Sequence, residues 1–206
     1  MRRLSNCRSC VQGLTAFVLG AWTMAGLAPA RAAAELTIVV NKGSFADVGE
    51  AATGEERVNW WDADLTDDRA CTECFAAEEL AHFLPLGTPV AKAAVRFQSP
   101  DRLPGSGDLI LLGSRQSNPL IAARRVPETP PLATDQSFRL HAVREGERTI
   151  TVIEGRDRCG VLYGVYEYLQ QLGLRFFGLG EQGTVGPKER SPLPTAPRTA
   201  PPARES

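Results

Sequence analysis

Histidine and net positive charge are both scarce in this sequence. The 206 residues include 2 histidines, and 23 Lys and Arg are balanced by 24 Asp and Glu. A nucleic-acid-binding protein usually concentrates a basic excess on one face, so this balance argues against nucleic acid as a partner. Zinc usually takes four ligands, but besides Cys71 and Cys74 the chain after residue 33 offers Cys159, His82 and His141, without matching spacing. We therefore predict no metal site, no cofactor and no self-sufficient catalytic constellation.

The first 33 residues have the features of an export signal. Arg2, Arg3 and Arg8 precede an apolar run from Val11 to Ala28, and Ala30-Arg31-Ala32 is a small-x-small cleavage pattern. The alternative is an anchor that stays in the membrane, but no charged stop-transfer flank follows the run. We predict a signal peptide at 1–33, exported by general secretion or the twin-arginine route, and hence a secreted or periplasmic protein.

Removing the signal peptide would leave 19 basic against 24 acidic residues, a net charge of −5. Such a chain would not be drawn to an anionic membrane or to nucleic acid by charge alone. At the other end, residues 189–206 contain five prolines among Ser, Thr, Ala and Arg. This composition predicts a disordered tail or a linker. The folded domain is then expected at residues 35–188.

Hydrophobic periodicity and turn residues predict alternating strands and helices within this domain. Residues 43–66 show no clear period and are expected to form a long irregular loop that carries Trp60 and Trp61. Together the elements predict an α/β (α+β sandwich) fold with a mixed β-sheet and helices packed on one face. The expected strands are 36–40, 90–97, 108–112, a hairpin of 138–144 with 149–153, and 174–177; the expected helices run from Asp67 or Asp68 to Leu84 before Pro85, from Asn118-Pro119, and from Cys159 to Leu172.

The stretch Gly155-Arg-Asp-Arg-Cys-Gly-Val-Leu-Tyr-Gly-Val-Tyr-Glu-Tyr-Leu169 is the most distinctive part of the sequence. With residues 172–177 and 183–188, it resembles the N-terminal, non-catalytic domain of family 67 α-glucuronidases. It is similar as well to the related domain that precedes the barrel in family 20 β-N-acetylhexosaminidases. The resemblance implies a fold like domain 2 of β-hexosaminidases. Gly160 and Gly164, four residues apart on one helix, would let the helix backbone approach the sheet closely.

In these enzymes the chemistry resides in a following (β/α)8 barrel with paired acidic residues. About 18 residues follow Lys188, whereas a barrel needs roughly 250. The resemblance thus implies an exported accessory domain for polysaccharide breakdown that lacks the catalytic residues. Its partner would be a glycosidase barrel, joined in cis in relatives or supplied in trans. We expect the chain alone to be inactive.

Trp60 and Trp61 offer a second interpretation. Sugar C–H faces stack on tryptophan, so the Trp60/Trp61 loop could bind carbohydrate, such as an acidic oligosaccharide, and the chain would be a freestanding carbohydrate-binding module. Alternatively, the two rings pin the loop onto the domain or onto a barrel, since large aromatics mainly bury area.

Cys71 and Cys74 form a Cys-x-x-Cys pair near the start of an expected helix. A helix N-terminus lowers thiol pKa values, so a periplasmic thiol protein is a third interpretation. A thioredoxin-like site would have a strand directly before the pair, which is absent here. A structural disulfide or two buried thiols are the alternatives.

Overall fold

The computed structural model describes residues 35–91, 95–124, 131–178 and 180–195. The signal peptide predicted at 1–33 lies outside these residues. So do residues 196–206 of the predicted tail. Within the described part of that segment, the Ser191 N–H donates to the Gly87 carbonyl at 2.9 Å, and Leu193 packs against the core.

The described residues form a mixed five-stranded sheet, which confirms the α/β prediction. Three pairings are parallel, and the β4–β5 hairpin places an antiparallel strand at one edge. The order across the sheet is β2-β1-β3-β5-β4. The strands are β1 (Leu36–Val39), β2 (Val95–Gln98), β3 (Asp108–Gly113), β4 (Phe138–Glu145) and β5 (Arg148–Gly155).

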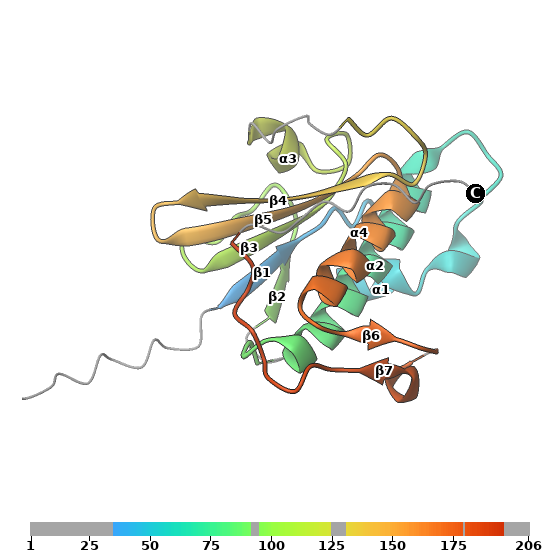
Figure 1. The fold of residues 1–206 in the computed structure, drawn as a ribbon. Helices are drawn as coiled ribbons and strands as arrows, with labels where there is room; N and C mark the ends of the chain where they lie inside the picture. Colours follow the sequence, from blue (N-terminus) through green and yellow to red (C-terminus); the bar gives the residue numbers. More distant parts are fainter. Residues whose placement is uncertain (1–34, 92–94, 125–130, 179, 196–206) are drawn as a thin grey trace, which may run out of the picture. The chain divides into compact units, whose positions relative to one another are not determined.

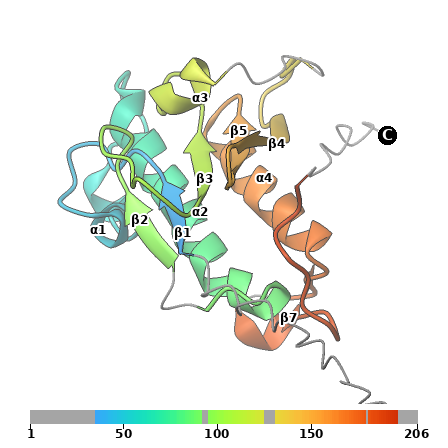
Figure 2. The same cartoon turned by 90° about the vertical axis from the view of Figure 1, so that its left-hand side faces the viewer.

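Three helices cover one face of the sheet, as Figure 1 shows: α1 (Val48–Ala52), α2 (Leu65–Gly87) and α4 (Arg158–Gln171). Their apolar side chains form one buried cluster with inward residues of the strands, such as Ile38 and Ile110. The short helix α3 (Pro119–Ala123) lies beside the end of β3 (Figure 2) and packs Ile121 on the opposite face. Alternation along each strand divides the apolar residues between the two faces.

The loop predicted at 43–66 contains two short helices, α1 and the 3-10 helix η1 (Glu55–Arg57). Asp47 caps α1 by accepting from the Glu50 N–H at 2.8 Å, and the Glu50 carboxylate accepts from the Ala46 N–H at 2.5 Å. The two carboxylates satisfy backbone N–H groups at the start of a helix of five residues, which is too short to show a hydrophobic period.

Helix α2 begins earlier and ends later than the sequence indicated. Asp64, not Asp67 or Asp68, is the N-cap, and its carboxylate accepts from the Thr66 N–H at 2.9 Å. Pro85 lies inside the last turn and does not end the helix, which is closed by the Thr88 N–H donating to the Leu84 carbonyl. All three aspartates suit a helix N-terminus, so composition alone could not choose between them.

The strand predicted at 174–177 does not join the main sheet. The short strand β6 (Arg175–Phe176) pairs with β7 (Thr184–Val185) in a separate two-stranded ribbon that includes the 3-10 helix η3 (Glu181–Gly183). Phe176 is in edge-to-face contact with Phe83 at 5.3 Å and with Tyr166 at 5.0 Å between ring centroids. These aromatic contacts fasten the ribbon to α2 and α4.

The close approach predicted for Gly160 and Gly164 is confirmed. A Cβ atom at Gly160 would lie 2.4 Å from the Ser137 carbonyl oxygen, and one at Gly164 would lie 2.7 Å from the Ile153 Cγ2. The helix therefore rests directly on β5 and on the segment before β4. Gly173 follows with a φ of 90°, the left-handed conformation expected after the helix.

We expect Gly160→Ala to lower the free energy of unfolding by about 1–3 kcal/mol, since the methyl group meets backbone that cannot rotate away. This loss would appear although alanine favours a helix over glycine by about 1 kcal/mol. Denaturant unfolding measures it. Gly105→Ala is the control, because a Cβ there meets nothing within 4 Å. Equal stability of the two variants would contradict the close approach.

Candidate functional site

The carboxyl ends of β1, β3 and β5 lie at one edge of the sheet, where open α/β sheets usually bind their ligands. Here the crevice between β1 and β3 is filled by side chains. The Asn41 amide donates to the Ser117 carbonyl at 2.9 Å. The Asn118 amide donates to the carbonyls of Val39 at 3.2 Å and Leu112 at 2.9 Å. The loop after β1 and the loop after β3 are thus joined by hydrogen bonds.

A buried carboxylate lies beneath these loops. Glu73 of α2 is fully buried, and one of its oxygens accepts from the Ser117 hydroxyl at 2.9 Å, while the other has no hydrogen-bond partner. Burial raises the pKa of Glu73 from 4.5 to about 7, against the opposing effects of Ser117 and Arg69. A Cβ at Gly113 would lie 3.1 Å from the unpartnered oxygen, so little space remains for a ligand.

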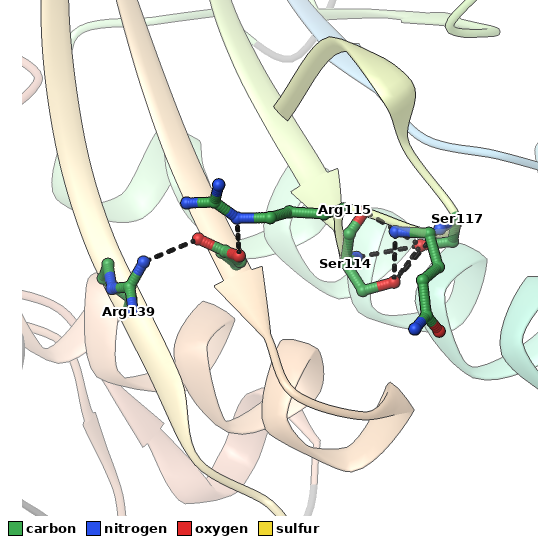
Figure 3. A network of polar contacts seen from close by, with 6 residues as sticks. Ser114, Arg115, Ser117 and Arg139 are labelled. Carbon is green, nitrogen blue, oxygen red and sulfur yellow. Dashed lines mark hydrogen bonds and ion pairs between the residues drawn. The ribbon is translucent and has the colours of Figure 1, made fainter. Parts of the chain in front are cut away.

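Two arginines share a second buried carboxylate at the end of β5. Glu154 accepts from Arg115 Nε at 2.8 Å and from Arg139 Nη1 at 3.1 Å. Figure 3 shows Arg115 and Arg139 reaching this carboxylate from two sides, next to the paired hydroxyls of Ser114 and Ser117. Arg139 lies directly opposite Glu154 in the β4–β5 hairpin, whereas Arg115 follows β3, and sequence spacing could not reveal that it reaches the same carboxylate. Because Glu154 and Arg139 are both buried, we interpret the cluster as a structural ion pair.

The structure separates the two predicted tryptophans. Trp61 is 95% exposed. Trp60 is half-buried: its indole N–H donates to the Glu55 carbonyl at 3.1 Å, and the Arg158 guanidinium lies 5.0 Å from the ring centroid. Arg158 also pairs with the buried carboxylate of Asp68. Trp60 is therefore held in place by contacts with Glu55 and Arg158, and Trp61 takes no part in these contacts.

Trp60 lines a cavity of about 650 Å³ between the α1–η1 segment and α2. Its volume falls within the range of small-molecule sites in proteins. Apolar groups predominate in the walls, and four side chains bring hydroxyl or carboxylate oxygens. The lining residues are Gly49, Ala52, Thr53, Glu55, Trp60, Cys71, Thr72, Phe75 and Glu78. A neighbouring cavity of about 460 Å³ shares Gly49 and Glu78 and reaches Lys42 and Phe97.

Cys71 and Cys74 are free thiols, both buried in α2. Because the helix begins at Leu65, the pair lies beyond its first turn, where the dipole no longer favours a thiolate. Burial raises the pKa of Cys71, with Glu55 as a further cause, and burial raises the pKa of Cys74 to about 12. These directions are opposite to those of a reactive thiol at neutral pH.

Two further properties concern the described residues alone. No group of three or more His, Cys, Asp or Glu side chains among them is arranged to hold a metal ion. No helix in these ranges has both the length and the apolar character needed to cross a membrane.

The described residues thus form an α/β domain with buried polar clusters in its interior and an open pocket beside α2. A comparison with protein families matches residues 47–168 to the N-terminus of glycosyl hydrolase family 67. The match covers more than half of the chain and runs from the cap of α1 into α4. A search among curated proteins found no match. The chain belongs to the family of N-terminal domains of family 67 glycosyl hydrolases, the α-glucuronidases.

Proposed function

We propose that this protein is the exported accessory domain of an α-glucuronidase system that degrades polysaccharide, and that it packs beside a catalytic (β/α)8 barrel. The observation that carries the proposal is the family match over residues 47–168, since this domain has a catalytic domain as its partner in relatives. Export is supported by the basic, apolar and small-residue pattern of residues 1–33.

Exposed apolar side chains on the β6–β7 ribbon, directly after β6 and at the end of α2 form the surface that we propose for the catalytic partner. Phe177 is 80% exposed, and Val185 and Leu86 are 54% and 41% exposed. A Cβ at Gly186 would lie 3.7 Å from the Leu86 Cβ, so the ribbon and the end of α2 are adjacent. Several large apolar side chains exposed together commonly mark a protein–protein contact.

The test uses the full chain and a separately produced family 67 catalytic domain encoded in the same genome. We expect the chain alone to leave aryl glucuronides and aryl N-acetylglucosaminides intact and to bind the catalytic domain. Phe177→Ser should weaken this binding by about tenfold, as for a central interface residue. Trp61→Ser, at the opposite end of α2, is the matched control for loss of an exposed aromatic. Turnover by the chain alone, or the absence of association, would overturn the proposal.

Two other interpretations of the sequence remain: a thiol protein and a carbohydrate-binding module. The raised pKa values of Cys71 and Cys74 disfavour a thiol protein. Carbohydrate binding is favoured by one specific observation, the position of Trp60 in the wall of the larger cavity.

A further inference from the structure

We propose that the cavity beside Trp60 binds an uncharged sugar residue, with Trp60 and Phe75 as its aromatic walls. Trp61 plays no part in this site. The inference concerns the ligand of this domain and goes beyond its association with a catalytic domain.

The aromatic wall is formed before any ligand arrives. The Trp60 ring is oriented by its hydrogen bond to Glu55 and by the Arg158 guanidinium, which the buried Asp68 holds in turn. A side chain already fixed in its binding orientation loses little conformational entropy when a ligand binds. Since Arg158 lies over one face of the ring, the opposite face is the one that can stack against the apolar C–H face of a pyranose.

Phe75 provides the second apolar wall. Its neighbours in α2, Cys74 and Ala76, are fully buried, whereas Phe75 lines the cavity and is 42% exposed. Because this large aromatic side chain remains partly exposed, it gives the cavity a second apolar surface in addition to Trp60.

The polar atoms of the lining determine the charge of the ligand. Glu55 and Glu78 contribute carboxylates, and Thr53 and Thr72 contribute hydroxyl groups. Sugar hydroxyls donate to such acceptors. The described lining residues include no lysine or arginine, and the guanidinium of Arg158 beside Trp60 is already paired with the Asp68 carboxylate. A uronic acid would place its carboxylate near that of Glu55, and like charges in one site disfavour binding. The cavity therefore fits a neutral sugar, in contrast to the acidic oligosaccharide that the sequence suggested.

The experiment is isothermal titration of the full chain with cellotriose, xylotriose and chitotriose as neutral probes, and with trigalacturonic acid as an acidic probe of the same length. We expect at least one neutral trisaccharide to bind and the acidic one to bind at least about tenfold more weakly. Trp60→Ala and Phe75→Ala should each reduce the affinity by about tenfold. Trp61→Ala should leave it unchanged.

A second comparison and one further variant keep the test decisive. Trp60 also contacts Arg158, so if Trp60→Ala disturbs the fold, Phe75→Ala carries the comparison, with circular dichroism as the check. Glu55→Arg, at an exposed position of the lining, should strengthen binding of trigalacturonic acid. The proposal is wrong if no neutral trisaccharide binds, if the acidic one binds more tightly, or if Trp61→Ala weakens binding as much as the lining variants do. Failure here would leave the association through Phe177 untouched.

Discussion

Replacing Glu154 with alanine is expected to lower the free energy of unfolding by about 3–5 kcal/mol. The Glu154 carboxylate lies between Arg115 and Arg139, and the side chains of Glu154 and Arg139 are each 5% exposed. Without the carboxylate, Arg139 would remain a buried cation facing Arg115. Removing one partner of a buried ion pair costs more than the pair itself contributes, because the other charge has lost its compensation.

Chemical denaturation of Glu154→Ala measures the effect. The matched control is Asp135→Ala, which breaks the ion pair between Asp135 and Arg156. The side chains of these two residues are 89% and 49% exposed, respectively. Solvent-exposed ion pairs contribute about 0–1 kcal/mol, so this control should remain close to wild type. If both variants lost the same free energy of unfolding, the buried pairing of Glu154 with Arg115 and Arg139 would not stabilise the fold as we predict.

The second large effect concerns pH. Because burial raises the pKa of Glu73 from 4.5 to about 7, the folded state favours the protonated carboxyl. The associated stability is fully present below pH 4.5 and is lost as the pH rises through about 7. Each tenfold change in an ionisation equilibrium is worth about 1.4 kcal/mol, so the loss should amount to about 3 kcal/mol.

Glu73→Gln keeps an oxygen for the Ser117 hydroxyl and removes the ionisation. Relative to wild type, this variant should gain about 3 kcal/mol in unfolding free energy between pH 4.5 and pH 8. Urea unfolding at several pH values tests this. Glu50→Gln is the control, since the Ala46 N–H and Arg57 lower the pKa of Glu50 and no such gain is expected. A constant difference between Glu73→Gln and wild type would show that the carboxyl is not protonated in the folded protein.

Regular elements could be predicted because their signals are local. The hairpin β4–β5 and the helix α4 were expected from alternation and helical spacing, and Asn118 caps α3 as its Asn-Pro pair indicated. The stretch from 43 to 66 was not predictable in the same way. Helix α1 has five residues, too few for a period, and it is stabilised by caps and by packing against α2.

The candidate site was predictable only in part. Trp60 and Trp61 are chemically identical neighbours, and nothing in their spacing indicates that one is held by Glu55 and Arg158 while the other is 95% exposed. The position of Cys71 and Cys74 at a helix N-terminus, expected from the sequence, is wrong because the N-cap of α2 is Asp64. The sequence gives no signal that Phe75, unlike its buried neighbours Cys74 and Ala76, lies in the cavity wall.

The order of residues along the chain by itself determined the α/β class, the mixed sheet and the family resemblance of the segment around α4, since these depend on short-range periodicity and on a contiguous motif. The tertiary structure alone decided that Glu73 bonds to Ser117 and that Glu154 is shared by Arg115 and Arg139. It also decided that Trp60 and Phe75 line the same cavity. These groups are separated along the chain, and they come together because burial of apolar surface packs the helices against the sheet. Burial also sets the pKa of Glu73, a property that the residue type alone does not contain.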